Sequence, residues 1–435
     1  MISLFIFRRD LRLEDNTGLI EALKNSEVVI PAFFLDPRQL ENNDYFSENA
    51  FEFMINSLKE LDSELKSKGS KLYLFKGEPE EVIKELKIDS VYLNEDYTPF
   101  SKERDAKIKN FCEENNIGFN SYHDLLLNEP GKVLKEDGKP YTVFTPYFNK
   151  AVKYNVKKPI KNNYSNYYKG EIKNTIALPN VKSNPSLFVK GGRKEALSVF
   201  KNSFLRYDEE RDYPSVKGTT GLSAHHKFGT ISIRESYEVF SKMNKFLTTE
   251  LYWRDFFTTI AYYHSHVFGK PFHKKYEKIT WETEHFDKWK EGMTGYPIVD
   301  AGMRELNKTG YMHNRVRMIT ASFLTKHLLI DWRKGEKYFA SKLVDYDPCV
   351  NNGNWQWASS TGCDAQPYFR IFNPWRQQER FDRECEYIKK WVPELKGLTA
   401  REIHNLKEEP VKNYPEPVVE HETARKRALE RYKGI

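Results

Sequence analysis

The chain is poor in cysteine and has no long apolar run. Only four of its 435 residues are cysteine and none form a CxxC pair, so we expect a reducing compartment and no disulfide framework. The loose cysteine spacing does not support an iron–sulfur cluster, and no HExxH pattern indicates zinc. The apolar N-terminal stretch is too short for a signal peptide. We therefore expect a soluble, cytoplasmic protein with no membrane span and no metal site.

Two common nucleotide-binding motifs are also missing, because the chain contains neither GxGxxG nor a P-loop. Aromatic residues, by contrast, are abundant at 14%, and the formal net charge is +7. This charge is compatible with a polyanionic partner, but a slightly basic soluble protein without such a partner would have the same composition. Function must therefore be sought in local patterns.

The first third of the chain alternates short apolar runs with amphipathic segments. Strand-like runs cover residues 4–7, 28–35, 72–75 and 90–93, and helical patterns cover residues 16–25, 47–68, 79–86 and 101–115. This βαβα order predicts an α/β domain over residues 1–128, with a Rossmann-like parallel sheet covered on both faces. Ligands bind such sheets at the carboxyl ends of the strands.

The rest of the chain changes character twice. Residues 129–190 are rich in Lys, Asn, Pro and Tyr and show little periodicity, which predicts an interdomain connector. Its tyrosines indicate that it packs on the protein, although a disordered linker is the alternative. Residues 191–435 are expected to form an all-α domain, with helical patterns at 195–204, 233–246, 248–264, 298–309, 315–329, 336–343 and 424–432.

Glu250, Trp253 and Arg254 are spaced i, i+3, i+4 and so share one face of a predicted helix. A carboxylate, an indole ring and a guanidinium together suit a planar, polar, anionic ligand. A surface ion pair beside a half-buried tryptophan would give the same pattern, and this face taken alone favours that simpler interpretation.

Asn314, Arg317 and Met318 repeat that spacing, with Arg315 pointing elsewhere. A buried arginine needs a carboxylate partner, and Asp345 and Asp347 are candidates. An unpaired buried polar group costs about 1–3 kcal/mol, so a cluster of them is either a satisfied ion-pair network or the lining of a cavity. Two such faces in one domain favour a cavity.

Residues 218–223 (GTTGLS) form a hydroxyl-rich turn directly before a predicted helix. Such a turn can hold a phosphate at the positive end of the helix. Threonine and serine are also ordinary helix caps, so the turn is only weak support for a phosphate site.

Three longer motifs carry a resemblance to a known family: residues 7–16 (FRRDLRLEDN), 294–304 (TGYPIVDAGMR) and 369–374 (FRIFNP). The chain resembles the photolyase/cryptochrome family along nearly its whole length. Within the family it is most similar to class I photolyases, which repair cyclobutane pyrimidine dimers in DNA. The resemblance implies an α/β antenna domain followed by an all-α domain that binds FAD.

The resemblance also implies which residues bind FAD. By motif position, the residues that would contact its phosphates are Tyr207, Thr219, Thr220 and Ser223. Those that would line the ribose, adenine and isoalloxazine portions are Asn314, Arg317, Asp345, Asp347 and Asn351. Asn351 matches the position facing the flavin N5, where a neutral amide suits a flavin reduced by two electrons. Plant cryptochromes carry Asp there and animal cryptochromes carry Cys.

A second set of positions matches residues that hold the damaged bases. Trp253 and Trp357 would stack on the two flipped pyrimidines, a contact worth about 1–3 kcal/mol per base. Glu250 would hydrogen-bond the dimer and stabilise its radical anion, and Met318 would pack against it. The (6-4) photolyases have two histidines where this chain has Asn314 and Met318, so the resemblance argues against (6-4) repair.

Two further sets complete the implied machinery. Trp355, Trp332 and Trp281 match a chain of tryptophans that conducts electrons to the excited flavin, although the spacing around Trp281 departs from the family pattern. The positions that match arginines gripping DNA phosphates are Arg211, Arg254, Arg315, Arg370 and Arg380. Such contacts give affinity without reading sequence.

The antenna position is the weakest part of the match, because Thr98 stands where folate-binding relatives tend to carry Glu. Folate, a deazaflavin or no antenna chromophore all remain open. We expect a monomeric lyase that uses FAD and light to repair pyrimidine dimers in DNA. The alternative is a blue-light-sensing flavoprotein of the cryptochrome type, which Asn351, Glu250 and Met318 argue against.

Overall fold

A computed structural model describes residues 1–435, and the contacts within it divide the chain into two compact units. Unit 1 comprises Met1–Ser183, Val189–Ser203 and Thr220–Ser265; unit 2 comprises Asn184–Phe188, Phe204–Thr219 and His266–Ile435. The units do not follow the boundaries predicted at 128 and 190. The segment that follows residue 128 groups with the sheet, because its backbone pairs with β2: Tyr168 N–H donates to the carbonyl of Val29 at 2.8 Å.

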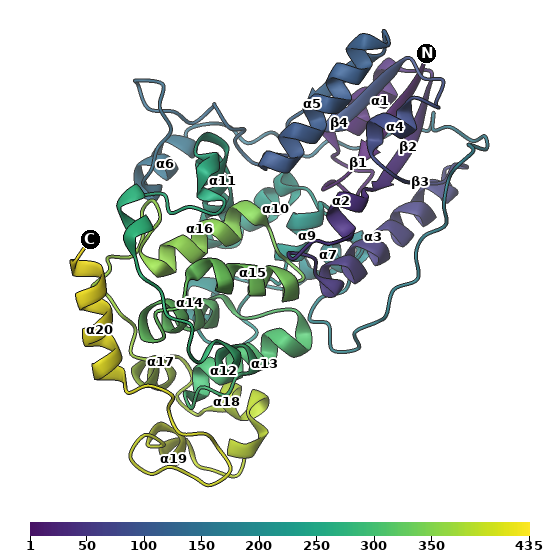
Figure 1. Ribbon diagram of the computed structural model, residues 1–435. Coiled ribbons are helices and arrows are strands. Elements are labelled where there is room, and N and C mark those ends of the chain that lie inside the picture. The colour runs from purple at the N-terminus through teal and green to yellow at the C-terminus, as the bar shows by residue number, and fades with distance from the viewer. The chain divides into compact units, whose positions relative to one another are not determined.

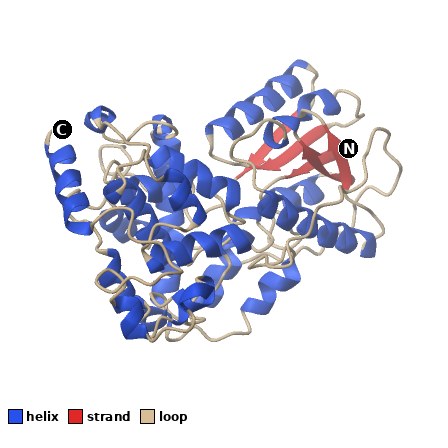
Figure 2. Ribbon diagram, turned by 60° about the horizontal axis from the view of Figure 1, so that its bottom comes forward, coloured by secondary structure: helices blue, strands red, loops and turns tan.

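Unit 1 is built on a five-stranded parallel sheet in the order β3-β2-β1-β4-β5, with helices packed against it (Figure 2). The strands are β1 Ile2–Phe7, β2 Val28–Leu35, β3 Tyr73–Lys76, β4 Ser90–Asn94 and β5 Gly118–Tyr122. Four of them were predicted within two residues at each end. The fifth strand, β5, was not predicted, because it is a short edge strand whose polar sequence carries no apolar alternation.

The helices of unit 1 follow the strands and the connector (Figure 1). They are α1 Thr17–Asn25, α2 Pro37–Leu40, α3 Glu48–Ser67, α4 Pro79–Ile83, α5 Pro99–Glu114, α6 Phe144–Ala151, α7 Arg193–Val199, α9 Ser223–Phe228, α10 Ile233–Phe240 and α11 Lys245–Tyr263. The helix predicted over residues 233–246 ends at Phe240. Asn244 then caps α11 by accepting from Phe246 N–H at 2.9 Å, so a polar capping residue starts a new helix where periodicity alone suggested continuation.

Unit 2 is helical, as predicted for this part of the chain. Its helices are α8 Tyr207–Glu210, α12 Phe286–Glu291, α13 Pro297–Thr309, α14 Asn314–Ser322, α15 Trp332–Lys342, α16 Pro348–Ser359, α17 Pro374–Phe381, α18 Glu386–Trp391, α19 Ala400–His404 and α20 His421–Lys433. Short 3-10 turns lie at Ser265–Val267, which straddles the two units, and within unit 2 at Lys274–Lys278 and Pro393–Leu395. A π-helical turn, Phe323–His327, follows α14 directly.

The core of unit 2 is a single large apolar cluster drawn from α12 to α19. Trp289 and Trp332 are among its largest fully buried side chains. The cluster holds α13 to α16 together and so fixes the helices that carry Arg317 and Asn351. No helix in the chain combines the length and apolar character needed to cross a membrane.

Candidate functional site

An ion pair of two predicted site residues of unit 2 joins α14 to the segment before α16. The guanidinium of Arg317 donates to both carboxylate oxygens of Asp345, at 2.8 and 3.1 Å, and its Nε donates to the Met312 carbonyl at 2.7 Å. This confirms the expectation that Arg317 pairs with a carboxylate, although its side chain is half-buried rather than fully buried. Burial lowers the pKa of Arg317, but Asp345 and other anions outweigh it and raise the pKa above its ordinary value.

Asp347, the other candidate carboxylate, has a different role in the fold. It caps α16, and its Oδ1 accepts from the backbone N–H groups of Cys349 and Val350 at 3.1 and 3.2 Å. The start of α16 therefore depends on Asp347, and the same helix then presents Asn351, Trp355 and Trp357.

Asn351 lies half-buried on the first turn of α16. Its Nδ2 donates to the backbone carbonyl of Glu336 at 3.3 Å. In this orientation its Oδ1 points away from that donor contact and can accept a hydrogen bond. Sequence reasoning did not identify Glu336, a buried residue of α15 whose backbone orients this amide.

Two predicted phosphate-contacting residues, Tyr207 and Thr219, also belong to unit 2. The hydroxyl of Thr219 lies near that of Tyr311, and the Tyr311 ring stacks on Phe188 with ring centroids 3.8 Å apart. The Arg317 guanidinium lies over the same Tyr311 ring, 5.3 Å from its centroid. Tyr311 therefore links the Thr219 hydroxyl to the Arg317–Asp345 pair, a connection that no sequence pattern revealed.

The remaining phosphate-contacting candidates, Thr220 and Ser223, belong to unit 1. The Thr220 hydroxyl accepts from Leu222 N–H at 3.3 Å, and Ser223 is the exposed first residue of the short helix α9. The turn also contains Gly221 with a φ of +66°, a conformation that favours glycine.

The predicted electron-transfer tryptophans share the core of unit 2. Trp355 and Trp332 are each 2% exposed, and Trp281 is half-buried against the same cluster. The ring of Trp355 makes T-shaped contacts with Phe339 at 4.9 Å and with Trp289 at 6.2 Å. A Cβ at Gly335 would lie 2.3 Å from the Trp355 ring, so glycine is needed for α15 to approach it.

Helix α14 presents the two positions that distinguish lesion classes. Asn314 is exposed and Met318 is half-buried, whereas the neighbouring His313 is 5% exposed and caps the helix by accepting from Arg315 N–H at 3.2 Å. Burial lowers the pKa of His313 to about 4, while Asp212 opposes this shift. The imidazole of His313 is therefore neutral at physiological pH.

Two of the predicted DNA-contacting arginines of unit 2 flank one aromatic ring. The Arg315 and Arg380 guanidinium carbons lie 4.4 and 5.0 Å from the centroid of the Phe381 ring. Arg315 also pairs with Asp212 at 2.7 Å, whereas Arg380 is exposed and has no carboxylate within ion-pair distance. Of the other two arginines in this unit, Arg370 is exposed and Arg211 lies over the Tyr207 ring at 5.7 Å.

In unit 1, α11 carries the second polar and aromatic face predicted from the sequence. Glu250 is exposed on it and Trp253 is half-buried. The Trp253 ring stacks on Phe144 of α6, with centroids 3.5 Å apart and planes at 8°. Figure 1 shows α6 beside α11. Helix α6 was not predicted, because it is short and lies in a segment whose sequence shows little periodicity.

Arg254 does not present a free guanidinium on that face. Its two Nη groups donate to the backbone carbonyls of Leu125 and His226, the latter at 3.2 Å. These contacts tie α11 to two loops of unit 1 and favour a structural role.

The antenna position lies at the carboxyl end of β4, as expected for a parallel sheet. Thr98 caps α5: its hydroxyl accepts from Ser101 N–H at 3.2 Å and donates to the Ser101 hydroxyl at 2.8 Å. Arg38 and Arg104 approach the ring of Phe100, at 5.2 and 5.8 Å from its centroid. Both guanidinium groups are ion-paired, Arg38 with Asp36 and Glu78 and Arg104 with Asp105, and the Thr98 hydroxyl is used within the protein.

The donor set of unit 2 fits FAD. Arg317 has one Nη group that makes no hydrogen bond within the protein, and the side-chain oxygen of Asn351 can accept one. Thr219 adds a hydroxyl near Tyr311, the residue whose ring lies under the Arg317 guanidinium. A guanidinium suits a phosphate or carbonyl oxygen, and an amide oxygen suits a protonated ring nitrogen. No group of three or more His, Cys, Asp or Glu side chains is arranged to hold a metal ion.

Comparison with known proteins gives consistent matches over both units. A family model for the FAD binding domain of DNA photolyase matches residues 246–434, and a DNA photolyase model matches residues 3–162. The chain is 39% identical to the deoxyribodipyrimidine photo-lyase of Alkalihalophilus pseudofirmus, covering 98% of this chain and 97% of the relative.

Two solved structures are similar along the whole chain. An archaeal photolyase from Sulfolobus tokodaii, described with two FAD molecules, has a TM-score of 0.92 at 48% identity and full coverage of both chains. A bacterial class III photolyase from Agrobacterium tumefaciens has a TM-score of 0.89 at 33% identity, covering 99% of this chain and 97% of the other.

Proposed function

The chain belongs to the DNA photolyase family, and from this premise we propose that it repairs cyclobutane pyrimidine dimers in DNA with light, using FAD. The choice of a cyclobutane dimer as the lesion rests on the residues that α14 presents. The positions predicted to face the lesion, Asn314 and Met318, are both accessible, and the one nearby histidine, His313, is buried, neutral and occupied as a helix cap. A repair route that needs a protonated histidine at the lesion has no support here.

The protein's own residues would perform three tasks. Arg317, Thr219 and Asn351 would hold FAD, which when bound and reduced supplies the electron that light transfers to the dimer. Trp253 and Trp357 would stack on the extruded pyrimidines, since a damaged pair is already poorly stacked and costs less to flip.

Glu250 would complete the lesion site. It is exposed on the face of α11 that carries Trp253. Its task is to hydrogen-bond the pyrimidine carbonyl on which negative charge develops, an electrostatic role comparable to oxyanion stabilisation. The electron returns after the ring splits, so no cofactor is consumed.

The test is to illuminate the chemically reduced protein with an oligonucleotide containing one cyclobutane dimer and to follow the recovery of pyrimidine absorbance. We expect recovery only in the light. Glu250→Ala should lower the yield per absorbed photon at saturating DNA without lowering the FAD content, and Glu250→Gln should recover part of the yield. Repair of a (6-4) photoproduct instead, or no repair of either lesion, would contradict the proposal.

We also propose that any antenna chromophore is not a folate. Thr98, whose hydroxyl caps α5, stands where folate-binding relatives tend to carry a glutamate, so the carboxylate of that position is missing. Chromatography of the small molecules released on denaturation tests this. Recovery of a folate in stoichiometric amount would contradict it.

A further inference from the structure

A lysine-rich segment of unit 1 lies outside the predicted FAD, lesion and electron-transfer residues. Residues 132–161 contain eight lysines against only Glu136 and Asp137, a net charge of +6, whereas the whole chain carries +7. The segment forms a turn closed by the Leu134–Pro140 bridge, followed by α6. Nearly all of the excess charge of the protein is therefore concentrated in about thirty residues.

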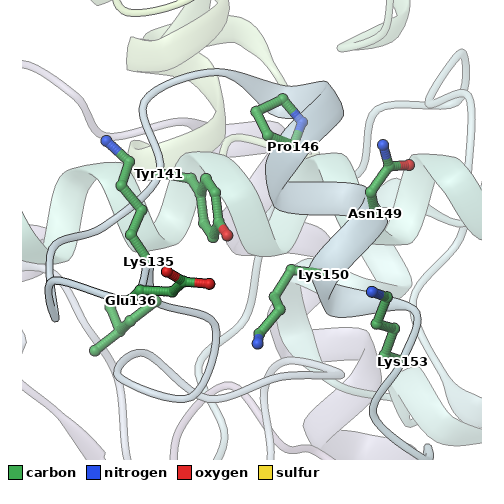
Figure 3. Close-up of a pocket in the computed structure, with 8 residues that line it drawn as sticks. Lys135, Glu136, Tyr141, Pro146, Asn149, Lys150 and Lys153 are labelled. Atoms are coloured by element: carbon green, nitrogen blue, oxygen red, sulfur yellow. The ribbon is translucent and has the colours of Figure 1, made fainter.

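This segment encloses a hollow of about 380 Å³. Figure 3 shows the turn residues Lys135, Glu136 and Tyr141 on one side and the α6 residues Pro146, Asn149 and Lys150 on the other. Leu134 and Lys153 complete the lining. Lys135, Lys150 and Lys153 form no ion pair with any carboxylate of the chain, unlike Lys139, which pairs with Asp137 at 3.7 Å.

The other face of α6 is packed on α11. Phe144 and Tyr147 are buried there, Phe144 against the ring of Trp253 and Tyr147 against Phe256 at 5.4 Å. A helix with its side chains is about 10–12 Å across, so the hollow lies about one helix diameter from Trp253. A DNA duplex advances about 34 Å per turn and can span both positions.

We propose that this hollow binds the phosphate backbone of the same DNA duplex whose lesion meets Trp253. The proposal rests on the proposed function, because Trp253 is taken as the lesion contact. Lysine ammonium groups attract phosphates without reading sequence, and the Asn149 amide and Tyr141 hydroxyl can donate to phosphate oxygens. Glu136 is the one carboxylate in the lining and opposes this binding.

The test uses the full-length FAD-loaded protein in the dark and labelled duplexes with and without one cyclobutane dimer. Affinity is measured at several salt concentrations for Lys150→Ala/Lys153→Ala. The matched control is Lys24→Ala/Lys109→Ala, which removes the same charge from side chains that are 57% and 55% exposed on α1 and α5.

We expect the hollow variant to lose roughly 10-fold or more in affinity at low salt, equally for damaged and intact duplex. The slope of log affinity against log salt should fall by about 1.8, or 0.9 per phosphate contact. Glu136→Gln should raise affinity for both duplexes. Repair yield per photon at saturating DNA should not change, because no residue of the hollow belongs to the lesion site.

An unchanged salt slope in the hollow variant, or an equal loss in the control variant, would overturn the proposal. The proposal would also be overturned if Lys150→Ala/Lys153→Ala lowered affinity for a folded RNA and left affinity for duplex DNA unchanged. Failure of the proposed function is distinguishable, since it would appear as absence of dimer repair by the wild-type protein, whatever the salt slopes of the variants.

Discussion

The indole ring of Trp253 lies parallel to the phenyl ring of Phe144, with centroids 3.5 Å apart and an interplanar angle of 8°. The two residues are 109 positions apart in the sequence, on α11 and α6. Phe144 is buried and Trp253 is half-exposed. The phenyl ring of Phe144 therefore supports one face of the Trp253 indole from inside the protein, while part of the indole stays accessible. The plane on which a base would stack is thereby fixed before DNA arrives.

Removing that support should weaken lesion recognition. An aromatic pair is worth about 0.5–1.5 kcal/mol beyond its buried area, so Phe144→Ala should lower the preference for damaged over intact duplex by about 2- to 10-fold. Phe144→Tyr should retain the preference, because the ring stays in place. Fluorescence titration against both duplexes measures the ratio, and an Ala variant with unchanged preference would show that Phe144 does not position Trp253.

Trp355→Phe should abolish or strongly slow photoreduction of the oxidised flavin and leave repair by the pre-reduced protein nearly intact. The two electron transfers use different routes, and Trp355 is buried in the core of unit 2 rather than on the lesion face. Trp289→Phe is the matched control, since Trp289 is also buried, 6.2 Å from Trp355, but is not among the predicted relay residues. Equal loss in both variants would contradict the assignment.

The predicted DNA-contacting arginines should separate into two groups. Arg370→Ala and Arg380→Ala should each lower the slope of log affinity against log salt by about 0.9, because both residues are exposed and neither has a carboxylate partner. Arg254→Ala should change the slope little and instead lower the unfolding temperature, because its guanidinium donates to two backbone carbonyls. By contrast, Trp357→Ala should lower the preference for damaged over intact DNA and leave the salt slope unchanged. Identical salt profiles for Arg254→Ala and Arg370→Ala would reject this division.

His313 should make stability depend on pH below neutrality. Burial lowers its pKa from 6.5 in the unfolded chain to about 4, so its stabilising contribution is present above pH 6.5 and is lost as pH falls toward 4. The loss should be about 1.4 kcal/mol per pH unit in that window. His313→Asn keeps a capping side chain but cannot titrate, so its free energy of unfolding should fall less steeply with pH. Parallel curves for the two proteins would show that His313 does not titrate in this way.

Much of the fold could be predicted from local sequence. Alternation and helical spacing placed β2 and α3 within a residue of their ends, because each buries one continuous apolar pattern. The Arg317–Asp345 pair could also be predicted, because an arginine removed from water needs a carboxylate partner and an unpaired charge there would be costly. The ordered motifs were sufficient to indicate the family.

Other features were decided only by tertiary structure. Asp345 and Asp347 carry the same side chain two residues apart, yet one pairs with Arg317 and the other caps α16. The sequence predicts that Arg254 binds a ligand, but its guanidinium donates to two loop carbonyls. No local sequence pattern predicts the stacking of Phe144 on Trp253. Local periodicity records which face of an element is buried, but not which distant segment covers it. That choice depends on contacts between residues far apart in the chain, and these form only when the whole unit packs.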